Sequence, residues 1–274
     1  MVALLCVIGY NDIVCRGKCQ TKSELVMGKV DILGVKFDKI TLEGAVDRAI
    51  SLLADDARGY IVVTPNPEMV MATRQNSEFM AALNQANICL PDGVGVVIAS
   101  RWLGERLEQR VPGIDFVNRL LQEICARGQA CRVYLLGAKP GVALRAGEKL
   151  RTDFPNMEIV GARDGYFTHE QEAAVVEEIS TKKPDILLVG LGFPRQELFI
   201  SRNRDKLLAK LSVGCGGTLD VFAGDVTRAP SVFQRLGLEW LYRLLRQPTR
   251  LLRMMALPHF AIEVLIHRYR RLKT

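Results

Sequence analysis

The sequence predicts an α/β fold, in which a mainly parallel, Rossmann-like sheet is covered by helices and followed by a helical, basic C-terminal appendage. Between Val30 and Gly217, short β-rich runs alternate with longer helical patterns, as in parallel sheets whose strands are joined by helices. Runs such as Ile186–Val189 are apolar throughout, which is typical of strands buried on both faces. At 274 residues and 49% hydrophobic content, the chain is long enough for a large core.

The strands are expected where β-branched and aliphatic residues cluster in short runs. These runs are Val30–Phe37, Tyr60–Thr64, Ile88–Pro91, Arg132–Leu136, Met157–Gly161, Ile186–Gly190 and Leu211–Gly214. Helical patterns lie between them, for instance Thr41–Ala54 and Pro67–Ala86, and Pro67 suits a first helical turn. We expect one compact α/β catalytic domain over residues 27–228.

Residues 229–274 form a different region, rich in Leu, Arg and Met, without strand signals and interrupted by Pro248 and Pro258. Two or three helices are expected there. From Arg228 onward the chain has ten Lys/Arg and two acidic residues, a net charge of +8, whereas the preceding part has 27 basic and 28 acidic residues, a net charge of −1. The overall charge of +7 therefore belongs to the C-terminal region.

Four arginines of this region are spaced by three, four and three residues, which would place them on one face of a continuous helix. They are Arg243, Arg246, Arg250 and Arg253. Pro248 lies between them and leaves that continuity open. Such a face suits an anionic membrane surface or a nucleic acid, but the intervening Leu, Met and Trp residues favour lipid or a protein pocket. A nucleic acid partner is not expected.

Residues 1–26 are expected to be an extension or a start-site artefact, because the first regular pattern begins just after Met27. Their apolar opening, Met1–Tyr10, lacks a basic leader and is far shorter than the roughly 20 residues of a membrane-spanning helix. The seven cysteines are scattered and mostly lie in apolar runs, as reduced thiols do in cytosolic proteins. A cytoplasmic protein is predicted.

Small or polar residues follow strand after strand. The segments are Thr64–Glu68, Pro91–Gly95, Gly137–Gly141, Gly190–Glu197 and Gly214–Asp220. Ligands of open α/β sheets bind beyond the carboxyl ends of the strands, and glycines such as Gly93 and Gly137 let the backbone approach a ligand, while helix N–H groups hold phosphate oxygens. Each loop alone is adequately explained as a tight turn, but their convergence favours a diphosphate-bearing ligand. None has the GxGxxG or GxxxxGK[ST] pattern of common NAD or ATP sites.

Asp92 follows the apolar run Ile88–Leu90 and precedes Gly93, which would place it at the mouth of the sheet against an apolar wall. A carboxylate there can have its pKa adjusted for taking a proton from a sugar hydroxyl. It can equally serve as the N-cap of a helix over Val94–Trp102. The local sequence slightly favours the cap.

No metal or other cofactor is expected. The sequence has no Asp-x-Asp pair, and its three histidines (His169, His259 and His267) form no ligand cluster. The charge of a departing diphosphate would therefore fall to arginines and helix ends.

Several motifs, taken together, resemble the WecG/TagA/CpsF glycosyltransferase family. They are Thr64–Glu68, Pro91–Gly95, Arg110–Gly113, Gly192–Glu197, Arg228–Pro230 and Leu238–Arg243. They follow the family's order and spacing from about Met27 to about Arg271. One departure is Arg195, where lysine is more usual, and both residues are cationic. The resemblance changes the preferred role of Asp92 from cap to base.

The resemblance implies an inverting, metal-independent transferase. Its UDP-sugar donor is UDP-N-acetylmannosamine, and its polyprenyl-diphosphate-linked acceptor is N-acetylglucosamine-diphospho-undecaprenol. The acceptor receives the sugar on its 4-hydroxyl. The product belongs to the synthesis of a wall teichoic acid linkage unit or a related surface polysaccharide. A same-fold transferase with another UDP-hexose or a UDP-N-acetylhexosaminuronate donor is the alternative, and a nucleotide- or nucleic-acid-binding protein is a distant one. A homo-oligomer is compatible with the sequence.

The resemblance also implies roles for particular residues. Asp92 is the catalytic base. Thr64, Asn66 and Gln196 make polar contacts that orient donor and acceptor, and Arg110 is a motif arginine with a less defined role. Tyr166 contacts the uridine through its aromatic ring, and Asp220 does so through its carboxylate. The appendage arginines Arg243, Arg250 and Arg253 engage the membrane on its inner face.

Overall fold

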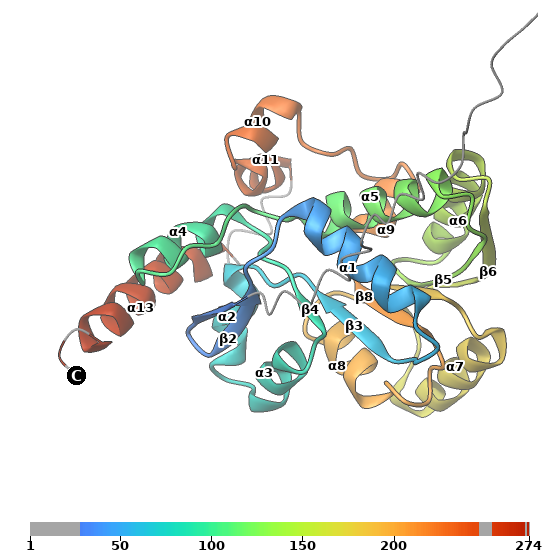
Figure 1. Ribbon diagram of the computed structural model, residues 1–274, viewed down its shortest axis with the longest axis horizontal. Helices are drawn as coiled ribbons and strands as arrows, with labels where there is room; N and C mark the ends of the chain where they lie inside the picture. The colour runs from blue at the N-terminus through green and yellow to red at the C-terminus, as the bar shows by residue number, and fades with distance from the viewer. Residues whose placement is uncertain (1–27, 247–253, 272, 274) are drawn as a thin grey trace, which may run out of the picture.

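The computed structural model describes residues 28–246, 254–271 and 273 (Figure 1). Its centre is a six-stranded sheet in the order β4-β3-β8-β7-β5-β6, with every neighbouring pair parallel. The strands are β3 (Tyr60–Val63), β4 (Ile88–Cys89), β5 (Cys131–Gly137), β6 (Met157–Arg163), β7 (Ile186–Gly190) and β8 (Leu211–Gly214). The predicted parallel α/β architecture is confirmed.

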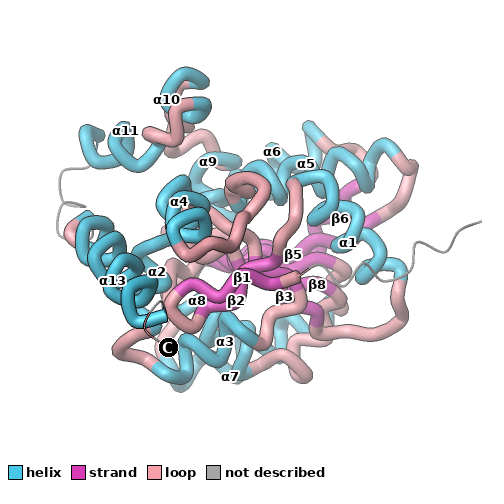
Figure 2. The backbone as a smooth tube through the Cα atoms, turned by 60° about the vertical axis from the view of Figure 1, so that its left-hand side comes forward, coloured by secondary structure: helices cyan, strands magenta, loops and turns pink. Residues whose placement is uncertain are grey.

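Helices cover both faces of this sheet (Figure 2). One layer contains α1 (Leu42–Ala54), α5 (Gly113–Ala126), α6 (Val142–Asp153) and α9 (Thr218–Phe222), and the other contains α3 (Ser77–Asn84), α7 (His169–Lys182) and α8 (Arg195–Arg202). Side chains alternate between the layers because successive residues of a strand point to opposite faces. In β5, Val133 and Leu135 join the core on the α1 side, while Tyr134 and Leu136 join the core on the α8 side.

The first predicted strand, Val30–Phe37, is wrong, because this stretch is a two-stranded antiparallel hairpin of β1 (Lys29–Ile32) and β2 (Val35–Asp38). Its two turn residues, Leu33 and Gly34, have φ angles of 54° and 93°, as a tight hairpin turn requires. The Gly34 N–H donates to Asp31 Oδ1 at 2.8 Å and closes the turn.

The hairpin also fixes β4, which is only two residues long. Asp38 is fully buried, and its Oδ2 accepts from the backbone N–H of Cys89 at 2.7 Å. Lys29 and Arg48 lie 3.8 and 3.4 Å from its other oxygen. Because Asp92 lies three residues beyond the end of β4, the hairpin contributes to placing it.

The helix predicted over Pro67–Ala86 is interrupted and forms two helices, α2 (Pro67–Thr73) and α3. The break occurs at Asn76, whose side chain accepts from the Phe79 N–H at 2.9 Å and caps α3, as asparagine does at helix starts. Pro67 occupies the first turn of α2, as predicted.

The regular elements among the described residues after β8 are helices: α9, α10 (Ser231–Arg235), α11 (Glu239–Arg246) and α13 (Ala256–Arg271). Helix α13 packs on α2 and on α4 (Val94–Trp102) (Figures 1 and 2). It buries Phe260 and Val264 in the core. Within the described ranges, none of the helices combines the length and apolar character needed to cross a bilayer.

Some sequence predictions fall outside what is described. Residues 1–26 do so, as do Pro248, Arg250 and Arg253, and of Arg243 only the backbone, in α11, is described. The common arginine face and the division of the chain into an extension, a catalytic domain and an appendage therefore stay predictions.

Candidate active site

A cavity of about 860 Å³ lies at the carboxyl edge of the sheet, and loops from all six strands line it. Lining residues from β3 and β4 are Thr64, Asn66 and Asp92; those from β5 and β6 are Ala138, Lys139, Gly165 and Tyr166; and those from β7 and β8 are Gly190–Phe193 and Cys215–Thr218. The strand-exit loops singled out in the sequence thus meet at one place, since parallel strands end at the same edge.

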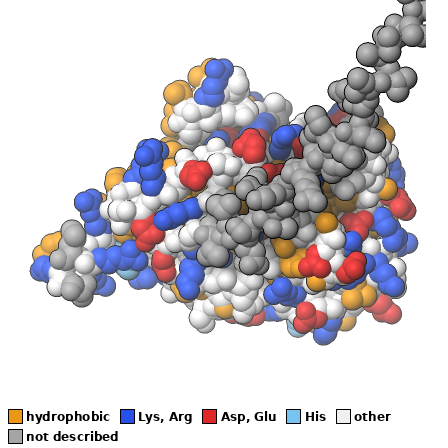
Figure 3. All heavy atoms as spheres, in the orientation of Figure 1, with side chains coloured by type: hydrophobic (Ala, Val, Ile, Leu, Met, Phe, Trp, Pro, Cys, Tyr) orange, Lys and Arg blue, Asp and Glu red, His pale blue; other side chains and the backbone are white. Residues whose placement is uncertain are grey.

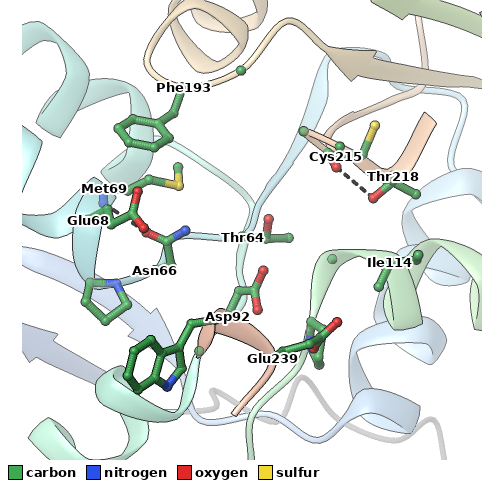
Figure 4. A pocket seen from close by; sticks show the side chains of 18 of the residues that line it. Thr64, Asn66, Glu68, Met69, Asp92, Ile114, Phe193, Cys215, Thr218 and Glu239 are labelled. Atoms are coloured by element: carbon green, nitrogen blue, oxygen red, sulfur yellow. Dashed lines mark hydrogen bonds between the residues drawn. The ribbon is translucent and has the colours of Figure 1, made fainter. Parts of the chain in front are cut away.

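Asp92 is held in the cavity wall by backbone hydrogen bonds on both sides. Its own N–H donates to the Pro65 carbonyl at 3.1 Å, and the N–H of Val111 donates to the Pro91 carbonyl at 2.9 Å. Figure 4 shows the Asp92 carboxylate projecting into the same open space as the side chains of Thr64 and Glu239. Asp92 is therefore fixed by main-chain contacts, with its carboxylate facing the cavity.

The cap position of α4 belongs to Gly93, which precedes the first helical residue and has φ +109°. A Cβ on Gly93 would lie 3.3 Å from Pro67 Cδ, and one on Gly95 would lie 2.8 Å from Pro67 Cγ. Glycine is needed because the chain turns here with positive φ against another helix. The N-cap assignment considered for Asp92 is therefore replaced by Gly93.

Thr64 and Asn66 lie beside Asp92 and have structural contacts of their own. The Thr64 hydroxyl is almost fully buried and donates to the Gly214 carbonyl at 3.4 Å, linking the ends of β3 and β8. Asn66 Oδ1 accepts from the Met69 N–H at 3.0 Å and caps α2. Both residues line the cavity, so each joins the framework to the site.

Arg110 lines the cavity and connects it to the C-terminal helices. Its Nη1 donates to Glu239 Oε2 at 3.1 Å, and its Nη2 donates to the Gln234 carbonyl at 3.4 Å. Glu239 Oε1 also accepts from Arg228 at 3.5 Å, and Arg228 makes a two-pronged contact with Asp115. Sequence reasoning gave Glu239 no role, although it is one of two acids in a basic region.

At the β6 side, Tyr166 stands at the cavity mouth with 70% of its surface exposed. Arg195 shapes this loop by donating to the carbonyls of Gly165 and Phe167, both at 2.8 Å, and its guanidinium lies 4.4 Å from the Phe167 ring centroid. Asp220, from α9, also lines the cavity. Arg195 and Lys139 are lining cations that the sequence did not single out for a role.

Two predicted contact residues are not part of the cavity lining. Gly137 packs its backbone against β7, and a Cβ there would lie 2.5 Å from the carbonyl carbon of Gly190. Gln196 is 4% exposed and sits behind the β8 loop, where its Oε1 accepts from the Gly216 N–H at 3.1 Å. Gly137 thus spaces two strands and Gln196 supports a loop, and direct substrate contact by either residue stays a prediction.

An apolar wall closes the side of the cavity next to the C-terminal helices. It is built from α4, α11 and α13 together with Met254, just before α13. Its members are Ile98, Trp102, Trp240, Met254, Leu257 and Phe260. The cavity therefore has a polar floor at the sheet and an apolar flank, an arrangement suited to an amphipathic ligand.

The described residues include one cysteine in the cavity lining and no cluster of metal-ligand side chains. Burial raises the pKa of the Cys215 thiol to about 12, so this lining residue stays a neutral thiol and a weak nucleophile. Nowhere in the described ranges do three or more His, Cys, Asp or Glu side chains gather as a set able to hold a metal ion.

Comparison with known proteins gives one family and several relatives. The model of the glycosyl transferase WecG/TagA/CpsF family matches residues 30–274. Relatives named N-acetylglucosaminyldiphosphoundecaprenol N-acetyl-beta-D-mannosaminyltransferase are 41% identical in Bacillus spizizenii (78% of this chain, 81% of the relative) and 39% identical in Bacillus subtilis (85% and 90%). A third, from Staphylococcus aureus, is 37% identical (86% and 92%). The chain belongs to the WecG/TagA/CpsF family of glycosyltransferases.

Proposed function

We propose that this protein transfers N-acetylmannosamine from UDP-N-acetylmannosamine to the 4-hydroxyl of N-acetylglucosamine-diphospho-undecaprenol, with inversion at the anomeric carbon. The observation that carries the proposal is the Asp92 carboxylate, fixed at the exit of β4 and facing a cavity lined by the loops of all six strands. The transferred sugar and the acceptor are supported by the names of relatives that match at least 78% of the chain.

The reaction is a single displacement. Asp92 takes the proton from the acceptor hydroxyl while its oxygen bonds to the anomeric carbon, and the bond from that carbon to UDP breaks on the opposite face. A well-placed general base contributes roughly 10²- to 10⁴-fold to such a step. Arg110 and Lys139 are cations of the cavity lining. They would stabilise the negative charge of the departing UDP.

The apolar flank supplies a place for the lipid part of the acceptor. Trp102, Trp240 and Leu257 would contact the isoprene units next to the diphosphate, while the sugar reaches Asp92 on the polar floor. Burial of apolar surface is worth about 25 cal/mol per Å², so a few isoprene units contribute substantially to acceptor affinity. This division explains why one cavity combines charged groups with two tryptophans.

Helix α13 offers a face for the membrane that holds this acceptor. Its exposed apolar residues follow helical spacing: Ile262, Leu265, Ile266 and Tyr269. Exposed Arg268, Arg270 and Arg271 stand next to them, and Figure 3 shows basic side chains gathered over the end of the molecule formed by α4 and α13. Each Lys/Arg close to anionic lipid contributes about 1 kcal/mol. We infer peripheral association with the cytoplasmic face of the membrane, with Arg243, Arg250 and Arg253 as further predicted contacts.

The donor sugar is tested by competition. Purified full-length protein with a short-chain lipid-diphospho-N-acetylglucosamine acceptor receives equal amounts of UDP-N-acetylmannosamine, UDP-N-acetylglucosamine, UDP-glucose and a UDP-N-acetylhexosaminuronate. The proposal expects mass spectrometry to find mainly the N-acetylmannosaminyl product. Preferential transfer of another sugar would replace the donor while keeping the reaction type.

A further inference from the structure

Glu197 is a buried acid that the reaction described above does not use. It is the third residue of α8 and only 1% exposed. Its Oε1 accepts from the Gln196 side-chain amide at 2.7 Å, while its Oε2 is buried and has no hydrogen-bond partner among the described residues. Burying a carboxylate oxygen without a partner is costly, so its retention in this position calls for a physical reason.

The contact between Glu197 and Gln196 fixes the direction of the Gln196 amide. An ionised carboxylate only accepts hydrogen bonds, so the NH₂ end of the amide must face Glu197. The carbonyl end is then presented to the Gly216 N–H, from which it accepts at 3.1 Å. An amide turned the other way would put two donors against each other at Gly216.

The space for this pair is made by Gly214 at the end of β8. A Cβ there would lie 3.1 Å from Gln196 Nε2 and 3.3 Å from Glu197 Oε1. The loop that follows, Cys215–Thr218, lines the cavity. The backbone of this loop is held at Cys215, whose N–H donates to the Val189 carbonyl at 2.9 Å. Gln196 holds it one residue later, by accepting from the Gly216 N–H.

We infer that Glu197 is a positioning residue for the donor half of the cavity, acting through Gln196 to hold the Gly216 loop in the shape that receives the nucleotide sugar. The inference rests on the proposed function, because it assigns the β8 side of the cavity to the donor. The same half of the cavity contains Asp220 from α9 and extends to Lys139 and Tyr166, which follow β5 and β6.

The charge state of Glu197 provides a readout. Burial raises the pKa of this carboxyl group to about 7. Above that pH the ionised form accepts a charge-assisted hydrogen bond from Gln196, which is stronger than a neutral one. Donor affinity is therefore expected to fall as the pH falls through about 7.

Other titratable groups around Glu197 are already paired or neutral. Helix α8 packs on α3, β3 and β8. In β3, Tyr60 bonds to Asp55, and in α3, Glu78 bonds to Arg202. Strand β8, with the sequence Leu-Ser-Val-Gly, has no ionisable side chain, and Cys215 next to it stays a neutral thiol. On α8 itself, Arg195 donates to backbone carbonyls. His169, at the start of α7, lies 3.6 Å from Glu172. The Gln196→Ala variant below therefore decides whether the pH response between 6 and 8 acts through Glu197.

The test measures binding of UDP-N-acetylmannosamine without acceptor, by calorimetry on the full chain at pH 6 and pH 8. A nucleotide sugar is used because its phosphodiester groups do not titrate in this range. For wild type, we expect the Kd to be roughly five- to ten-fold higher at pH 6 than at pH 8. Glu197→Gln should have the higher Kd at both pH values.

Two further variants show whether Glu197 acts through Gln196. Gln196→Ala should abolish the pH response, and adding Glu197→Gln to it should weaken binding no further. Asn203→Ala is the matched control. Asn203 is a buried polar residue at the other end of α8, where it bonds to Glu172 and Phe199. It is not part of the cavity lining. The variant should lose thermal stability but keep wild-type donor affinity and pH response.

The outcomes are separable. A pH-independent Kd in wild type, additive effects of the two substitutions, or equal loss of affinity in Asn203→Ala would overturn the inference even if Glu197→Gln did not fold. Failure of wild type to bind the nucleotide sugar at either pH would instead reject the proposed function.

Discussion

Arg110, in the loop before α5, donates to Glu239, the first residue of α11, at 3.1 Å. The same carboxylate accepts from Arg228, which is held by Asp115 on α5. A cation of the cavity is therefore partly neutralised by an acid of the C-terminal helices, so the position of those helices and the charge available to a diphosphate are coupled.

This network predicts a measurable cost for Glu239→Gln. Removing the charge of the buried Glu239 leaves two arginines undercompensated, and we expect a loss of about 1–3 kcal/mol in the free energy of unfolding. Urea denaturation measures it. Asp153→Asn is the control, because the Lys149–Asp153 pair is exposed and such pairs contribute about 0.5 kcal/mol or less. Equal effects of the two substitutions would show that the network does not stabilise the fold.

Asp92→Asn should lower the transfer rate by roughly 10²- to 10⁴-fold, because an amide cannot take the acceptor proton. The fold and UDP affinity should change little, since the Asp92 contacts that fix this segment include its backbone N–H to Pro65. Single-turnover kinetics and calorimetry check both points. A variant with wild-type transfer would remove Asp92 from the mechanism.

Membrane association is better tested by substitution than by deleting residues 229–274. Deletion would also remove Phe260 and Val264 from the core, so a loss of activity would have two explanations. Ile262→Ser with Leu265→Ser changes exposed side chains only and should lower sedimentation with anionic liposomes at least tenfold, given roughly 1.5–3 kcal/mol for each buried aliphatic side chain.

Leu144→Ser is the matched control for the membrane experiment. Leu144 is 60% exposed on α6, in the layer of helices away from α13. It should leave liposome binding unchanged. If the α13 variant sediments like wild type, the membrane face lies elsewhere on the protein.

Glu197 also gives a prediction for stability against pH. Its pKa in the folded protein is raised from 4.5 to about 7, so its favourable contribution is fully present below about pH 4.5 and is lost as the pH rises through 7. Relative to wild type, Glu197→Gln should therefore gain on the order of 3 kcal/mol between pH 5 and pH 8. Urea unfolding at both values decides this, and a pH-independent difference would contradict it.

The sequence predicted the sheet and the meeting of its loops because buried parallel strands have a clear apolar signature and all end at one edge. The β1–β2 hairpin was missed because Leu33, in its turn, is apolar and Val30–Phe37 therefore resembles one β-rich run, although the apolar positions change phase at Leu33-Gly34. The break before α3 was missed because Asn76 caps a helix within a continuous helical pattern.

The site was predicted less completely for a different reason. Which way a side chain points depends on packing. The sequence alone therefore could not show that Gln196 lies behind the Gly216 loop and supports it. Glu239 reaches Arg110 from 129 positions along the chain, and local sequence patterns do not report such a pairing.

The most direct test of the central claim is a transfer assay with UDP-N-acetylmannosamine and a short-chain lipid-diphospho-N-acetylglucosamine acceptor, run with wild type and Asp92→Asn, each with and without a chelator. The account predicts that wild type forms a β-linked lipid disaccharide with release of UDP in both conditions, and that Asp92→Asn forms almost none. Absence of the disaccharide with folded, nucleotide-binding wild type, or equal product from Asp92→Asn, would contradict it.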